Sequence, residues 1–135
     1  MGSRILVSVG SEKAISEIET IYGIALPIDF RTYLLECNPP LDNLDHNATY
    51  WWPIARLKSV RHALPSKLDS KEFAVIADDH LVFADYMVGA WIWAICCRTG
   101  PDFGCVVQLG RGCRVVANSF AEFIDAYVAN RDDLF

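Results

Sequence analysis

Apolar residues recur at three- and four-residue steps over residues 11–22, which predicts an amphipathic helix. Ser11 is suited to cap its first turn, and Gly23 to take the left-handed conformation just past its end. The same spacing over residues 27–37 predicts a second helix. We expect Asn38-Pro39-Pro40 to end it, because neither proline can donate a helical hydrogen bond.

Two further helices are predicted later in the chain. Residues 120–128 carry a third apolar stripe, and Ser119 together with Glu122 forms a capping box at its start. A shorter helix is predicted over residues 57–64, where the apolar positions again fall on one side.

The remaining apolar runs are short, rich in aromatic and β-branched residues, and separated by turn residues. We predict strands over residues 50–54, 73–77, 81–87, 91–97, 104–109 and 113–117. The last two flank Gly110-Arg111-Gly112, which is typical of a tight hairpin. Pro53 indicates that the first strand lies at a sheet edge.

The predicted order is two helices, five or six strands with a short helical interruption, and a closing helix. Helices segregated from hairpin-linked strands predict an α+β fold with a mainly antiparallel sheet. No repeat, linker or separate charge block divides the chain, so we expect one domain over residues 1–135. Helices on one face of the sheet would leave its other face available for function.

The cysteine content favours a reducing compartment. Five cysteines are an odd number, so they cannot all pair within one chain as in a secreted disulfide framework. Residues 1–10 lack the apolar core of a signal peptide, and Leu6 breaks the myristoylation pattern. The richest apolar stretch, residues 81–97, is too short and polar to span a bilayer. We therefore expect a cytoplasmic protein without a membrane partner.

The formal net charge of −5 narrows the class of partner. Proteins that bind nucleic acids neutralise phosphates with basic surfaces, so a nucleic-acid partner is not expected. An acidic surface favours a neutral or a basic partner.

Catalytic and metal-binding motifs receive little support. The nucleophile-elbow pattern is absent. A reactive thiol needs an electropositive setting, whereas Cys105 lies close to the acidic Asp102. Cys96 and Cys97 would point to opposite faces of a strand, so they cannot easily hold one tetrahedral ion. We expect them to be small buried residues, and we expect no enzyme, cofactor or metal.

Two acidic turns remain as candidate sites. Asp78 and Asp79 precede His80, and a second group before Tyr50 consists of Asp42, Asp45 and His46. Two carboxylates and an imidazole could bind a divalent cation or act as acid and base. Aspartate in turns more commonly makes local hydrogen bonds to the backbone, which is the interpretation we favour.

The tryptophans form a second unusual feature. Trp51 and Trp52 are consecutive, so one is expected to face the core and the other not, whereas Trp91 and Trp93 should share one face. Core packing explains most of this pattern. The alternative is an exposed aromatic patch that anchors a protein partner.

Three segments of the chain resemble, in order, the SUKH superfamily, which contains the yeast SMI/KNR cell-wall-synthesis regulator and many bacterial relatives. The segments are the helical block from Ile15 to Leu35, the block Phe73-Ala74-Val75-Ile76-Ala77-Asp78, which is similar to the family's central strand, and Asn118-Ser119-Phe120-Ala121-Glu122-Phe123-Ile124. The similarity spans about residues 12–130. It implies an α+β domain with a curved sheet and helices on one side.

This chain departs from the family pattern in two loops. It has Asn38-Pro39-Pro40 where many relatives have Asn-Gly-Gly, and Asp78-Asp79-His80 where the central turn is often rich in glycine. Because both differences lie in loops, they bear on the partner rather than on the fold.

The resemblance implies an immunity protein that binds and blocks a cognate toxin, such as a nuclease, which is a basic protein. The predicted contact residues come from two loops and a turn and are Asp42, Asp45, Trp51, Trp52, Asp78, Asp79, His80 and Asp102. One alternative is a regulatory or scaffolding module that binds a cellular protein, as in the yeast branch. Another is a small enzyme or metal binder that uses the Asp/His turns. The oligomeric state stays open.

Overall fold

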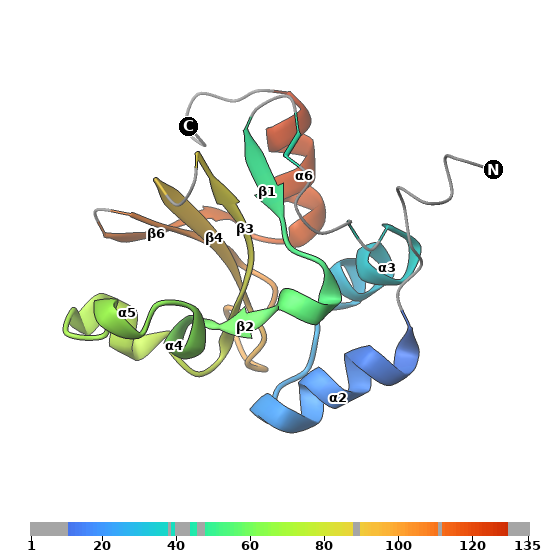
Figure 1. Cartoon of the computed structure of the whole chain (residues 1–135), viewed down its shortest axis with the longest axis horizontal. Helices are drawn as coiled ribbons and strands as arrows, with labels where there is room; N and C mark the ends of the chain where they lie inside the picture. Colours follow the sequence, from blue (N-terminus) through green and yellow to red (C-terminus); the bar gives the residue numbers. More distant parts are fainter. Residues whose placement is uncertain are drawn as a thin grey trace.

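The computed structural model describes residues 11–37, 39, 44–45, 48–87, 90–110 and 112–129. The helices are α2 (Glu12–Tyr22), α3 (Ile28–Cys37), α4 (Val60–Ala63), α5 (Lys71–Val75) and α6 (Phe120–Val128), with 3-10 turns η1 (Ile54–Arg56) and η2 (Pro65–Lys67). The strands are β1 (Thr49–Trp51), β2 (Lys58–Ser59), β3 (His80–Tyr86), β4 (Trp91–Cys96), β5 (Val106–Leu109) and β6 (Cys113–Ala117) (Figure 1).

The strands form one open, curved sheet in which all pairs are antiparallel. The order is β1-β3-β4-β5-β6, and β2 pairs with the first part of β3. β1 therefore lies at an edge, where Pro53 follows it, and β5 and β6 form the predicted hairpin. The predicted α+β class with a mainly antiparallel sheet is confirmed.

Local capping explains where the predicted helices begin. The Ser11 hydroxyl accepts a hydrogen bond from the Ala14 N–H at 3.1 Å, and Gly23 takes a left-handed conformation with φ 64° after α2. The Ser119 hydroxyl accepts a bond from the Glu122 N–H at 3.0 Å at the start of α6. These side-chain oxygens satisfy N–H groups that have no partner within the helix.

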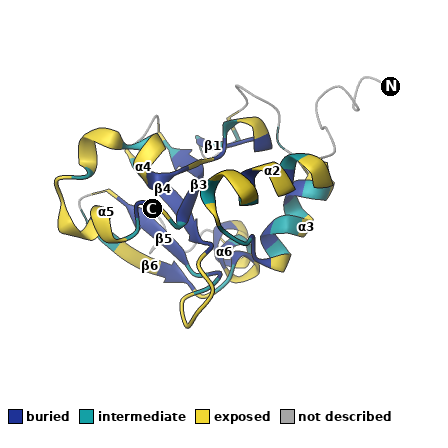
Figure 2. Ribbon diagram, turned by 90° about the horizontal axis from the view of Figure 1, so that it is seen from below, coloured by how far each residue is buried: buried dark blue, intermediate teal, exposed yellow. Residues whose placement is uncertain are grey.

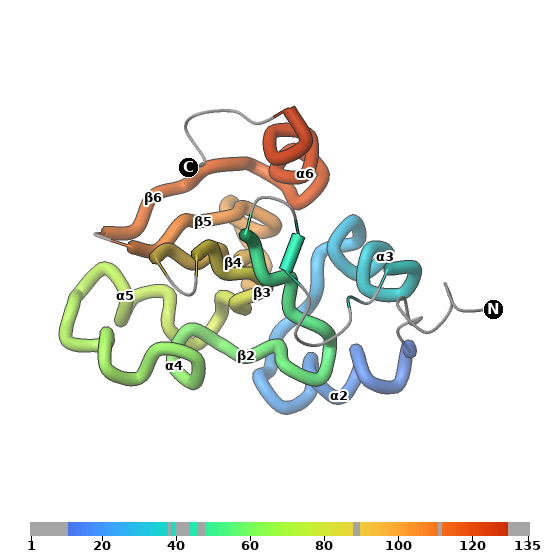
Figure 3. The backbone as a smooth tube through the Cα atoms, turned by 45° about the horizontal axis from the view of Figure 1, so that its top comes forward, coloured from blue at the N-terminus to red at the C-terminus, as the bar shows by residue number. Residues whose placement is uncertain are grey.

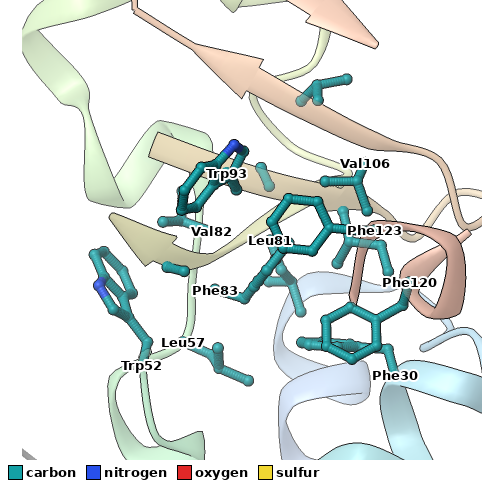
Figure 4. Packing of buried hydrophobic residues seen from close by; sticks show 14 of the residues in the cluster. Phe30, Trp52, Leu57, Leu81, Val82, Phe83, Trp93, Val106, Phe120 and Phe123 are labelled. Carbon is teal, nitrogen blue, oxygen red and sulfur yellow. The ribbon is translucent and has the colours of Figure 1, made fainter. Parts of the chain in front are cut away.

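The core lies between one face of the sheet and helices α3 and α6. Phe83 of β3 contacts Phe30 of α3 and Phe120 and Phe123 of α6, with ring centroids 5.4–5.7 Å apart (Figure 4). Trp93 of β4 is fully buried and lies 5.2 Å from Phe123. Burial of these rings supplies much of the hydrophobic stabilisation that joins the helices to the sheet.

The predicted strand over residues 73–77 is wrong, because residues 73–75 belong to the short helix α5 and residues 76–77 to the turn that follows it. A strand would bury alternate residues, but Phe73 and Ala77, four positions apart, are buried whereas Val75 is 71% exposed. Burial at a four-residue step is the helical pattern. In such a short apolar run, residue type alone does not distinguish a strand from a helix. The block that resembles the family's central strand therefore precedes strand β3.

The predicted helix over residues 57–64 is only half present. Lys58 and Ser59 form β2 and pair with Val82 and Leu81, and the helix α4 begins at Val60. The Ser59 hydroxyl caps α4 by accepting a bond from the His62 N–H at 3.3 Å. Pairing with β3 thus displaces the first turn of the predicted helix.

The second face of the sheet is also covered, in contrast to the expectation that it stays open. The four residues of β5 and all but the last residue of β3 are buried, which requires cover on both faces (Figure 2). The connection from β1 to α5 supplies this cover, with α4 and α5 on the far side of the strands from α6 (Figure 3). Its buried side chains are Trp52, Ile54, Leu57, Val60 and Phe73.

No helix within the described residues is both long and apolar enough to cross a membrane.

Candidate functional site

The turn before β3 and the first residue of that strand contain three of the predicted site residues, and the turn is tied to the end of β4. One carboxylate oxygen of Asp79 lies 2.7 Å from Nδ1 of His80, and the other lies 3.2 Å from the Arg98 guanidinium. The Asp79 carbonyl also accepts a bond from the Cys97 N–H at 2.8 Å. Asp79 therefore fixes this turn, as expected for aspartate in a turn.

Asp78 differs from its neighbour because its side chain is 72% exposed. Its two oxygens accept bonds from the Arg61 guanidinium at 2.6 and 3.1 Å. This hydrogen-bonded arginine holds the pKa of Asp78 below its ordinary value. Exposed ion pairs contribute little net stability, so a partner can replace Arg61 at small cost.

A groove of about 380 Å³ lies beside this turn. We call it the β3-start groove, and it is lined by Tyr22–Ala25, Asp78, Asp79 and Cys97–Thr99. The Ala25 N–H donates to the Cys97 carbonyl at 3.2 Å and joins the two walls. The Tyr22 hydroxyl lies 3.2 Å from Nδ1 of the exposed His62, which places an aromatic pair at the groove.

The loop that carries Asp102 lies at the same end of the sheet. Gly104, with φ 89°, forms a β-bulge in which its N–H donates to the Cys96 carbonyl, and the Cys96 N–H donates to the Cys105 carbonyl, both at 2.9 Å. Asp102 is exposed, and its charge opposes the lowering of the His80 pKa. Asp78, Asp79, His80 and Asp102 are thus brought together.

His80 makes stability at this end sensitive to pH. Its ring is buried, and burial lowers its pKa below the ordinary value of 6.5, although the bonded Asp79 opposes this shift. The unfolded chain therefore binds this proton more readily than the folded protein. The stability that neutral His80 contributes is complete above pH 6.5 and is lost as the pH falls below it.

We expect the free energy of unfolding to fall between pH 7 and pH 5, with a share from His80 of at most about 1.4 kcal/mol per pH unit. His80→Gln should flatten this slope in urea denaturation series, whereas the same change at the exposed His62 should preserve it. An unchanged slope in the His80 variant would contradict the assignment.

A second group of predicted residues lies at the other end of β3. One oxygen of Asp45 accepts a bond from the Thr49 N–H at 3.0 Å, and the other accepts bonds from the Trp51 indole at 3.0 Å and from the Tyr127 hydroxyl. The side-chain oxygen of Thr49, which is fully buried, lies 2.7 Å from the Tyr127 hydroxyl oxygen. Asp45 therefore joins its loop to β1 and α6.

Trp51 also borders a pocket of about 260 Å³, whose lining is mainly apolar. Tyr33, Cys37, Pro39, Asp45 and Ile124 form the rest of its wall. The Trp51 side chain is half-buried. Its ring packs edge-to-face against the ring of Tyr127, with the two ring centres 5.0 Å apart.

Trp52 is buried on the opposite face. Its indole donates to Asp85 at 2.7 Å, and the Arg56 guanidinium lies 4.3 Å from the ring centre. The two tryptophans do point to opposite faces, but both faces are covered, so neither ring is fully exposed. Asp42 and His46 lie outside the described residues.

The predicted contact residues therefore form two groups. Thr49 pairs with Tyr86 at one end of β3, and His80 begins the other end. Six residue steps of about 3.3 Å separate these positions, or roughly 20 Å. The Asp45 loop and the Asp78 turn do not form one continuous site.

Asp85 is a buried acidic residue that the sequence interpretation missed. It is 6% exposed and lies next to the last residue of the largely apolar strand β3, where it accepts the Trp52 indole bond. A charged residue inside a buried strand requires a polar partner, and this requirement is the signal that could have revealed it.

The cysteines show no arrangement suited to nucleophilic chemistry. Cys96 and Cys97 are buried, and burial raises the pKa of both thiols. Burial also raises the pKa of Cys105, and the charge of Asp102 adds to the shift. Across the described ranges, no three His, Cys, Asp or Glu side chains are grouped so that they could hold a metal ion.

The open antiparallel sheet, with α2 and α3 before it and α6 after it, defines an α+β domain whose surface features are a groove and exposed charges. The chain belongs to the SMI1 / KNR4 family (SUKH-1), whose family model matches residues 10–126. This confirms the resemblance. The family comprises immunity-protein and SMI1/KNR4-like domains and is generally non-catalytic. Membership in it indicates that the partners are proteins. Comparison with curated proteins finds no match.

Proposed function

We propose that this chain is a non-catalytic immunity protein that binds and neutralises a cognate bacterial toxin, such as a nuclease. Family membership supports a protein-binding role. The observation that carries the proposal is the exposed carboxylate of Asp78 beside the β3-start groove, in a chain of net charge −5. A nuclease must present a basic surface to hold phosphate, so it offers matching charge.

Binding at this groove would proceed by exchange of ion pairs. Asp78 is paired with Arg61, and a lysine or arginine of the toxin would take the place of that guanidinium. Long-range attraction would raise the association rate, while the Tyr22–His62 ring pair offers apolar contact area for affinity. Neutralisation then requires only that the toxin's own functional surface be covered.

Asp45 and Trp51 remain proposed as a second contact at the pocket beside β1. Trp52 and Asp79 would act by holding the loops that touch the partner, since both are engaged within the chain. We place the protein in the cytoplasm, where its five cysteines stay reduced. No nucleic-acid contact is proposed, because the net charge is negative.

The test is protection of cells that express the toxin encoded beside this chain's gene. The wild-type chain should restore growth and bind the purified toxin. Replacement of both Asp78 and Asp102 by lysine should weaken binding by about 10- to 100-fold, because like charges would then face the toxin. Calorimetry at low salt would measure this loss.

Asp125→Lys is the matched control, because this exposed aspartate lies on α6, away from the groove. It should bind almost as tightly as the wild type. Equal binding by the wild type and the Asp78/Asp102 variant would refute the groove as the contact. Failure of the wild type to protect would refute the immunity role and favour the regulatory or scaffolding alternative.

A further inference from the structure

The two edges of the sheet are protected differently. On the outer side of β1, Leu44 forms a bridge with Tyr50, and the Asp45 N–H donates to the Thr49 carbonyl at 3.0 Å. β6 ends the other side of the sheet, and among the described strands it pairs only with β5. Within the part of the chain that the structure describes, no segment covers the β6 edge in the way that residues 44–45 cover β1.

The hydrogen bond of Cys113 shows which backbone groups face this edge. The Cys113 N–H donates to a carboxylate oxygen of Glu72 on α5 at 3.1 Å, so it points away from β5. Backbone groups two residues apart on a strand point the same way, so those of Val115 face the same edge. The Val115 side chain is 60% exposed. An edge of this kind is a template for an added strand.

The Glu72 carboxylate occupies the place that a carbonyl of an added strand would take. A cavity of about 360 Å³ lies beside this contact, lined by Glu72, Trp91, Gly112 and Cys113 among others, so α5 does not pack tightly against β6 here. Gly112 leaves room for the carboxylate. A Cβ atom at this position would lie 3.1 Å from the bonded oxygen, so the carboxylate would have to move by a few tenths of an ångström.

We propose that the outer edge of β6 is a strand-pairing surface for a second copy of this chain and that the Glu72 carboxylate keeps it closed. Antiparallel pairing centred on Val115 is self-complementary. It places Arg114 of each copy opposite Val116 of the other, so like charges do not face each other. The proposal is independent of toxin binding, which we place at the β3-start groove.

The test compares the solution masses of variants by light scattering over a wide range of concentration. Glu72→Ala should show about twice the wild-type mass at high concentration, as expected for a twofold pair. Val115→Lys added to Glu72→Ala should return the mass to the wild-type value, because a charge at the edge blocks pairing.

Gly112→Ala crowds the same contact without removal of the charge, since its methyl group would lie 3.1 Å from the Glu72 carboxylate oxygen, and it should raise the mass less than Glu72→Ala does. Gly110→Ala is its control, because the added atom would meet Trp91 instead. A folded Glu72→Ala protein with the wild-type mass at every concentration would overturn the proposal. A doubled mass that persists after Val115→Lys would overturn it too.

Discussion

Phe123→Ala is expected to lower the free energy of unfolding by about 3–5 kcal/mol, the largest effect predicted for a single residue here. Phe123 is fully buried, and its ring contacts Phe83 at 5.4 Å and Trp93 at 5.2 Å. Removal of the ring leaves a cavity between α6 and the sheet that these large neighbours cannot fill. Urea denaturation followed by tryptophan fluorescence would measure the loss.

The matched control for this variant is Val128→Ala on the same helix. Val128 is 75% exposed, so its truncation should change the stability by less than about 0.5 kcal/mol. Domains of this kind have a total stability of about 5–15 kcal/mol, so the loss in the Phe123 variant is a large share of the total. Similar losses in both variants would show that α6 is not held by its inner face.

Asp45→Ala is expected to lower the free energy of unfolding by about 3 kcal/mol, because it removes one acceptor from several donors. The Thr49 N–H, the Trp51 indole and the Tyr127 hydroxyl would all lose their carboxylate partner. Thr49 is fully buried, so water cannot readily replace the lost bonds. Chemical denaturation would give the change.

Asp69→Ala provides the comparison, since this aspartate is exposed and lies in the turn before α5. It should leave the stability nearly unchanged. The pair also separates two roles for Asp45. If Asp45→Ala keeps full stability but loses affinity for the toxin, Asp45 is a contact residue and not a structural one.

The sequence indicated the acidic turn of the candidate site but not its pairing. Asp78 and Asp79 stand out as consecutive carboxylates before a buried strand. Their partners, Arg61 and Arg98, come from α4 and from the end of β4, and only the antiparallel pairing of β3 with β4 brings Arg98 beside Asp79. Long-range register of this kind is not encoded in local periodicity.

The same limit explains the error at α5. Phe73 to Ala77 is apolar and short, so local preference permits a strand or a helix. Contact with the rest of the fold selects the helix α5, which buries Phe73, and the turn after it buries Ala77. The wrong prediction lay in the segment where local signals are weakest.

By itself the sequence determined the caps, the long amphipathic helices and the central strands, because these depend on the spacing of apolar residues and on single capping side chains. The tertiary structure decided the rest. It covered the second face of the sheet with Trp52 and its neighbours, and it placed Asp45 and Asp78 at opposite ends of β3. Both outcomes depend on chain packing between residues far apart in sequence, where burial of apolar surface outweighs local preference.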